Sequence, residues 1–205
     1  SACFSPGVAE NADFEKELYE SNNIKAFMAD YSVDKSPVEG KGFHFTKKFL
    51  GRTNDDVNMR LQDWVENHAD VGKDLLLQMD IEGAEYGVLL DTPKSTLRKF
   101  RVMVVEFHSL DQLFGSDSFQ WIEAVFDHLL DDFTVVHIHP NNCCPFWTMG
   151  EIEIPTVLEI TFYRSDQVIA TGKPVVYPHP LDEINVPKNH DIQLAKCWGV
   201  VYQAD

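Results

Sequence analysis

The segment LLLQMDIEGAEY, residues 75–86, changes from an apolar run to an acidic one without a proline between them. Its first part belongs to an apolar stretch, residues 74–81, that has the length and composition of a strand buried on both faces of a parallel sheet. Its second part carries Asp80, Glu82 and Glu85. A carboxylate at the mouth of a core strand is costly without a partner, so Asp80 marks a candidate ligand-binding edge. Alternatively, Glu82 and Glu85 only stabilise the start of the next helix.

The spacing of apolar residues on either side predicts strands that alternate with helices. We expect roughly five β-α units followed by an antiparallel hairpin. Such a pattern is typical of a doubly wound α/β domain, with a mostly parallel sheet of the seven-stranded type and helices on both faces. The expected strands are 2–5, 24–30, 43–50, 74–81, 101–107, 134–140 and 156–164, and the expected helices are 11–21, 57–69 with a stop near Gly72, 82–92, 95–100 and 118–133.

Residues 1–171 are expected to form this single domain. Residues 172–205 contain four prolines and predict an irregular tail that packs on the same domain. A long connecting segment, residues 141–155, precedes the last expected strand. Its Phe146 and Trp147 either form a lid over an acceptor or simply cover the edge of the sheet.

Composition narrows the class of protein. The chain has 205 residues and a formal charge of −16, so nucleic acid, which is bound largely through Lys and Arg, is not an expected partner. No stretch approaches the roughly 20 apolar residues of a membrane span. The four cysteines form no CxxC pair, which favours a reducing compartment. We therefore expect a soluble, cytoplasmic protein; its oligomeric state is open.

The strand ends define where a ligand is expected. In open α/β sheets, ligands bind beyond the carboxyl ends of the strands. Asp30 ends a strand where an acidic residue can accept hydrogen bonds from a ribose, although a solvated carboxylate is an equal alternative. The histidines could supply a general base or, with the carboxylates, a metal site. The full set at this edge is Gly7, Asp30, Asp80 with Glu82, Glu106 with His108, and His137 with His139.

The motif MDIEGAEY, residues 79–86, resembles the core motif of the FkbM-like methyltransferases, which are class I S-adenosylmethionine-dependent enzymes. FSPGVAENADFEKEL at residues 4–18 is similar to the cofactor loop of that family, and VVEFHSLDQLF and HIHPNN are similar to its later strands. The resemblance covers residues 2–164 and implies a class I methyltransferase fold with S-adenosylmethionine as the cofactor.

The resemblance also implies roles for individual residues. Gly7, Val8 and Ala9 are expected to face the methionine part of the cofactor, Asp30 to hold its ribose, and Asp80 to lie beside the methyl group. Ala9 departs from the family, since many relatives have a second glycine there. The chain also begins at the first strand, where relatives usually carry a preceding segment. No adenine-binding residue is identified, although residues 43–51 lie in the expected region.

Three functions follow as alternatives. The first is O-methylation of a hydroxyl on a small molecule, sugar or lipid, with Asp80 or His108 as the base and His139 as the third candidate. The second is a hydrolase with a divalent metal held by Asp80, Glu82, His108 and His139. The third is a non-catalytic binding protein with this fold. For the first, a divalent metal is possible but not expected.

Overall fold

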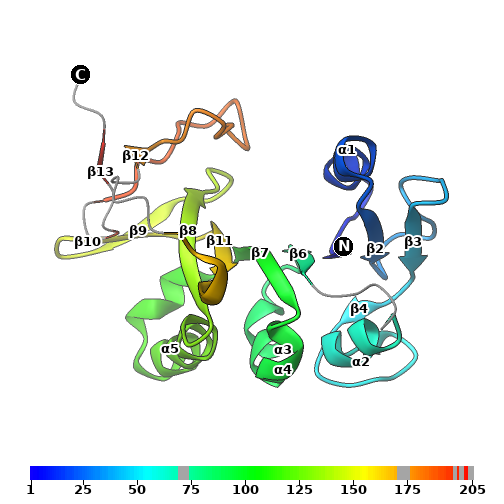
Figure 1. Cartoon of the computed structure of the whole chain (residues 1–205). Helices are drawn as coiled ribbons and strands as arrows, with labels where there is room; N and C mark the ends of the chain where they lie inside the picture. Colours follow the sequence, from blue (N-terminus) through cyan, green and yellow to red (C-terminus); the bar gives the residue numbers. More distant parts are fainter. Residues whose placement is uncertain (69–73, 170–175, 196–197, 199–200, 203–205) are drawn as a thin grey trace.

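The computed structural model describes residues 1–68, 74–169, 176–195, 198 and 201–202 (Figure 1). Its central sheet has seven strands in the order β3-β2-β1-β6-β7-β11-β8. All neighbouring pairs are parallel except those of β11, which runs antiparallel to both β7 and β8. This topology confirms the predicted sheet with its closing hairpin. The strands are β1 (Ala2–Pro6), β2 (Lys25–Ala29), β3 (Phe43–Thr46), β6 (Leu75–Met79), β7 (Phe100–Phe107), β8 (Phe133–Pro140) and β11 (Leu158–Arg164).

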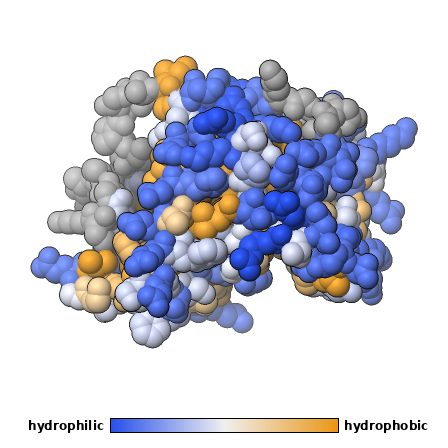
Figure 2. Space-filling model, turned by 90° about the horizontal axis from the view of Figure 1, so that it is seen from below, coloured by the Kyte–Doolittle hydropathy of each residue, from blue (hydrophilic) through white to orange (hydrophobic). Residues whose placement is uncertain are grey.

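Helices cover the sheet unequally (Figure 1). One face carries α1, and the opposite face carries α2, α3, α4 and α5. The outer side of these four helices is mainly hydrophilic with separate apolar patches, as expected for amphipathic helices (Figure 2). The bounds are α1 (Asp13–Asn22), α2 (Leu61–Glu66), α3 (Glu85–Asp91), α4 (Lys94–Leu97) and α5 (Ser116–Leu130).

The core lies mainly between the sheet and this second helical layer. On β6, Leu75, Leu77 and Met79 are buried while the residues between them are half-buried. That alternation is the period of a strand with one face on the core. A smaller apolar cluster lies under α1 and contains Val8 and Met28. Packing on both faces of the sheet thus fixes the positions of the ends of β1, β2, β6 and β7.

Several boundaries differ from the prediction. Residues 43–50 form not one strand but β3 and a separate β4 (Phe49–Leu50), which pairs with β5 (Asn58–Met59). The loop between β2 and β3 contains no helix, in agreement with the expected helices. The helix expected over 57–69 begins only at Leu61, and its predicted stop at Gly72 lies outside the described residues. The connecting segment, residues 141–155, contains a hairpin of β9 (Phe146–Met149) and β10 (Ile152–Pro155).

The C-terminal segment contacts β8 and the loop that follows it. Asn142 receives a hydrogen bond from the amide of Val186, and His137 Nε2 lies 2.9 Å from an oxygen of Asp182. In the described part of the chain, β12 (Val176–Tyr177) also pairs with β13 (Val201–Tyr202), and η2 (Leu110–Phe114) and η3 (Ser165–Gln167) are short 3₁₀ segments. The predicted boundary at residue 171 falls outside the described residues and stays a prediction.

Among the helices of the described residues, none combines the length and the apolar composition that crossing a membrane requires.

Candidate active site

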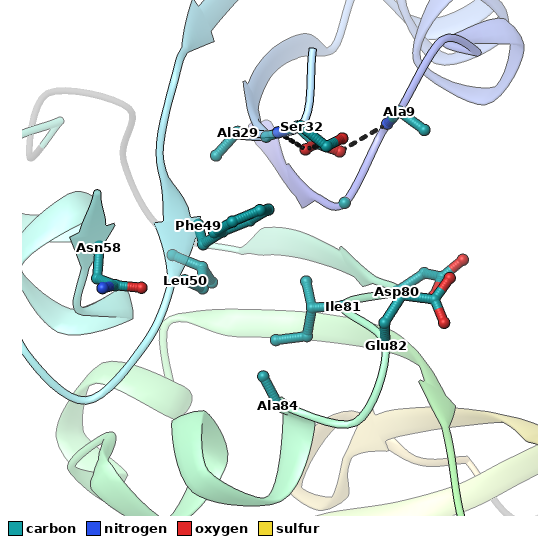
Figure 3. Close-up of a pocket in the computed structure, with 12 residues that line it drawn as sticks. Ala9, Ala29, Ser32, Phe49, Leu50, Asn58, Asp80, Ile81, Glu82 and Ala84 are labelled. Carbon is teal, nitrogen blue, oxygen red and sulfur yellow. Dashed lines mark hydrogen bonds between the residues drawn. The ribbon is translucent and has the colours of Figure 1, made fainter.

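A cavity of about 550 Å³ lies at the carboxyl ends of β1, β2 and β6 (Figure 3). Its size falls in the usual range of small-molecule and cofactor sites. Ala9 and Ser32 lie on one side, Phe49 and Leu50 on another, and Ile81 with Ala84 on a third (Figure 3). The remaining lining residues are Gly7, Ala29, Asp30, Asn58, Asp80 and Glu82.

Gly7 brings the end of β1 against the end of β6. Its φ is +86°, in the region that favours glycine, and its amide donates to the carbonyl of Ala29 at 2.8 Å. A Cβ at this position would lie 1.5 Å from the carbonyl oxygen of Asp80. Only glycine therefore allows the first turn to approach the Asp80 backbone, and this contact shapes one side of the cavity.

Asp30 fixes the opposite turn. Its side chain is buried, and its Oδ2 accepts a hydrogen bond from the amide of Ala9 at 2.8 Å. Its Oδ1 accepts from the amide and the hydroxyl of Ser32, at 2.8 and 2.6 Å. A carboxylate has about four acceptor positions, so one remains on Oδ2. Asp30 lines the cavity, and that position can accept a hydrogen bond from a bound hydroxyl.

Phe49 forms one wall of the cavity, although it was not among the site residues expected from the sequence. It lies on β4, its side chain is 43% exposed, and its ring is 5.4 Å from that of Tyr31. An exposed aromatic side chain at the edge of a cavity is suited to packing against a flat heterocycle. The strands β4 and β5 have two residues each, which is too short for an alternation of apolar and polar residues to be recognised. The only indication of this role in the sequence was that Phe49 lies within residues 43–51.

An acidic cluster lies next to the cavity on the side of β7. Glu85, the fully buried first residue of α3, accepts hydrogen bonds through Oε1 from the amides of Ile81 and Gly83, both at 3.1 Å. The same oxygen lies 3.0 Å from Nδ1 of His108, just beyond β7. Since the carboxylate accepts, Nδ1 carries the proton. Glu85 therefore binds both the turn after β6 and the histidine after β7.

The other nitrogen of His108 faces three carboxylates. Nε2 lies 3.8 Å from Oδ1 of Asp80, 3.6 Å from Oε2 of Glu106 and 3.4 Å from Oε2 of Glu82. Glu106 Oε1 also accepts a hydrogen bond from Asn141 at 2.7 Å. Asp80 belongs both to this cluster and to the cavity, where its side chain and that of Glu82 point away from Phe49 (Figure 3).

The crowding of carboxylates changes the proton affinities in this cluster. Burial, then the nearby charge of Glu106, raises the pKa of Asp80 to about 7. The hydrogen bond from Nδ1 to Glu85 is the main cause that raises the pKa of His108 to about 9, although burial opposes it. At neutral pH, His108 therefore favours its cationic form, and Asp80 binds a proton more readily than an ordinary aspartate does.

Two predicted residues lie apart from this group. His139 is on β8, separated from β7 by β11, with Nε2 3.1 Å from Oδ1 of Asn185 and Nδ1 3.7 Å from Asp182. The structure therefore brings Asp80, Glu82 and His108 together but not His139, contrary to the predicted metal set. The side chain of Val8 is buried in the small cluster under α1 and does not line the cavity, contrary to its predicted position.

The strand order, with a cavity at the carboxyl ends of the strands, is that of the class I methyltransferase fold. Residues 9–133, more than half of the chain, match a family model described as methyltransferase FkbM domain. The chain belongs to this family, which implies that it uses S-adenosylmethionine. No curated protein matches the chain.

Solved structures with a similar fold include a chain of the fibrillarin/Nop5p complex, with 9% identity, a TM-score of 0.44, and coverage of 80% of this chain and 72% of that one. A mutant of the 16S rRNA (adenine(1408)-N(1))-methyltransferase from Catenulisporales acidiphilia has 8% identity and a TM-score of 0.40, covering 80% of this chain and 84% of that one. Likenesses this distant do not bear on what the chain acts on.

Proposed function

We propose that this methyltransferase transfers a methyl group to a hydroxyl of a small molecule, a sugar or a lipid-like acceptor. The observation that carries the proposal is that Asp80 belongs to two neighbouring regions. It lines the cofactor-sized cavity, and it also belongs to the acidic cluster around His108. A methyl donor on one side of Asp80 and an acceptor on the other would meet at this carboxylate.

The residues of the cavity fit the cofactor. Gly7 leaves space where any Cβ would collide, Asp30 retains an acceptor position suited to a ribose hydroxyl, and Phe49 offers an apolar face for an adenine. When bound there, S-adenosylmethionine supplies an electrophilic methyl group on a positively charged sulfur. The carboxylates of Asp80 and Glu82 at the same edge favour binding of a cation.

A hydroxyl acceptor has to lose a proton as the new bond forms. A general base is most effective when its pKa is near the working pH, which the pKa of about 7 gives Asp80. His108, with a pKa of about 9, is less suited to accept that proton and instead helps to balance the surrounding carboxylates. Asp80 is therefore the base that we assign, in preference to His108 and His139.

The location and the partners form part of the same proposal. Cys3, Cys143 and Cys144 are free thiols, which supports a reducing compartment and hence a cytoplasmic location. The charge of −16 speaks against a nucleic-acid acceptor, because phosphate contacts require cationic side chains.

Binding of S-adenosylhomocysteine, measured by isothermal titration calorimetry, tests the cofactor site. Asp30→Ala removes three hydrogen bonds that hold Ala9 and Ser32, so affinity is expected to fall at least about tenfold. Asp34→Ala is the matched control, since the side chain of Asp34 is 95% exposed in the same loop and pairs with Lys47 on the surface. Absence of binding to the unmodified chain would overturn the cofactor assignment.

Methyl transfer to a panel of hydroxylated small molecules, with labelled cofactor, tests the acceptor chemistry. Asp80→Asn is expected to bind S-adenosylhomocysteine and yet to lose most turnover with the acceptor that is found. If Asp80→Asn and His108→Ala both kept full turnover, the proposed proton transfer would be wrong.

A further inference from the structure

His108 lies at the centre of more negative charge than it can balance. Nε2 has three carboxylates within 3.8 Å, and Nδ1 has Glu85 at 3.0 Å. The side chains of Glu85 and Glu106 are 0% and 12% exposed, so solvent screens them little. Even a protonated His108 leaves this cluster with an excess of negative charge that a bound cation would compensate.

Two buried oxygens in the cluster lack a partner. Oε2 of the fully buried Glu85 and Oδ1 of Asp80 both have no hydrogen-bond partner among the described residues. One ligand atom from each of Asp80, Glu85 and His108 lies within 4.8 Å of the others. An unpartnered buried carboxylate oxygen is costly, and Asp80 and Glu85 both belong to the group of residues whose ligand atoms converge.

The spacing suits a metal ion. Two ligands that each lie about 2.1 Å from one ion are about 3.0 Å apart at a right angle and about 3.4 Å apart at the tetrahedral angle. The distances from Nε2 to Asp80 and Glu106, 3.8 and 3.6 Å, exceed the tetrahedral separation by about 0.4 Å or less, so a small movement of these side chains would bring them to one ion. Glu85 provides the supporting contact that metal-bound histidines usually have, because its oxygen holds Nδ1–H and turns Nε2 toward the other carboxylates.

We propose that Asp80, Glu106 and Nε2 of His108 bind a divalent transition-metal ion, with Glu85 as the positioning residue of the His108 ring. A set of one imidazole and two carboxylates favours Mn²⁺ or Zn²⁺ over Ca²⁺. The site differs from the set expected from the sequence, since Glu106 takes the place of His139 and Glu82 is not a ligand. The ion would lie beside the cofactor cavity on the acceptor side, so its role rests on the proposed function. It would replace the proton on Nε2 of His108, hold the acceptor oxygen and make its hydroxyl more acidic, and Asp80 would then be a ligand of the ion in place of a free base.

Calorimetric titration of the chelator-treated chain with ZnCl₂ and with MnCl₂ tests the site directly. We expect one ion per chain for at least one metal, and affinity reduced at least about tenfold in Glu106→Gln and in Glu85→Gln. Glu106→Gln keeps the shape of the side chain and the oxygen that accepts from Asn141, so it should fold. His137→Gln is the matched control, because His137 forms another histidine–carboxylate pair, with Asp182 at 2.9 Å.

Binding with these variant effects supports the site. Three results would overturn it: no stoichiometric ion tighter than about 1 mM for either metal, unchanged affinity in Glu106→Gln, or an equal loss in His137→Gln. Titration of the same samples with S-adenosylhomocysteine separates the two proposals. If the nucleoside binds and no metal does, the metal site fails and the methyltransferase proposal stands; if only the metal binds, the cofactor assignment fails.

Discussion

Glu85 and His108 form a buried contact, with Oε1 of the carboxylate 3.0 Å from Nδ1 of the ring, across 23 positions of sequence. The next residue, Tyr86, donates its hydroxyl to the carbonyl of His108 at 2.7 Å. The start of α3 therefore fixes both the ring and the backbone at the end of β7. The acidic turn after β6 is a support for the neighbouring strand end as well as an edge of the cofactor cavity.

Removing the charge of Glu85 should lower the pKa of His108. In chelator-treated Glu85→Gln, we expect that pKa to fall from about 9 toward its ordinary value of 6.5, and the free energy of unfolding to fall by about 1–3 kcal/mol at neutral pH. Because the folded pKa is raised, the stabilisation is complete below about pH 6.5 and is lost as pH rises through 9. The difference in stability between Glu85→Gln and the unmodified chain should therefore shrink above pH 9. NMR titration of the ring measures the pKa of His108, and urea unfolding measures the free energy of unfolding.

Glu82→Gln is the control for this contact. Glu82 lies 3.4 Å from Nε2, but its side chain is 86% exposed, so solvent weakens its influence. A shift of the His108 pKa in Glu82→Gln as large as that in Glu85→Gln would contradict the role assigned to the buried contact.

A side chain at position 7 should disrupt the meeting of β1 and β6. Gly7→Ala combines a φ of +86° with a Cβ placed 1.5 Å from the carbonyl oxygen of Asp80. We expect the free energy of unfolding to fall by about 3 kcal/mol or more. Gly87→Ala is the matched control: its Cβ would meet only the flexible side chain of Arg52 at 3.4 Å, and alanine favours a helix. Urea unfolding of both variants checks this, and equal stabilities would contradict it.

The sheet could be predicted because its central strands have simple patterns. The apolar runs 74–81 and 101–107 are bounded by charged residues, and the observed strands β6 and β7 lie within one residue or two of them. The division of 43–50 could not be predicted, since β3 and β4 are separated by only two lysines and no glycine or proline marks the break.

The site could be predicted only as far as strand ends determine it. Asp80 and His108 follow neighbouring parallel strands, so their proximity follows from topology. His139 also lies near a strand end, but the insertion of β11 between β7 and β8 separates it, and a sequence pattern does not give strand order. The burial of Glu85 could not be predicted either, because an acidic residue in the first turn of a helix is usually exposed.

Phe49 should contribute to cofactor affinity without contributing much to stability. We expect Phe49→Ala to weaken binding of S-adenosylhomocysteine about tenfold, through loss of an aromatic wall. Phe119→Ala is the control, since both side chains are 43% exposed and Phe119 lies on α5, away from the cavity. Calorimetry on both variants measures the effect; a similar loss in Phe119→Ala would show that the effect is not local.

Glu15 lies buried on α1, far along the chain from the acidic cluster, and its protonation should affect stability. The hydroxyl of Ser5 contacts an oxygen of Glu15 and also Oε1 of Gln78 at 2.7 Å, although it has one proton to donate. A protonated Glu15 that donates to Ser5 satisfies all three groups. Burial accordingly raises the pKa of Glu15 above its ordinary value of 4.5.

Glu15→Gln should therefore stabilise the chain in a pH-dependent way. Because the folded pKa is raised, the stability that comes from protonated Glu15 is complete below pH 4.5 and is lost as pH rises through the folded pKa. The amide of glutamine donates at every pH, so the variant should match the unmodified chain at low pH and exceed it at neutral pH. Urea unfolding across this range measures the difference, with the exposed Glu17→Gln on the same helix as control. A constant difference at all pH values would show that folding leaves the pKa of Glu15 unchanged, which would contradict this prediction.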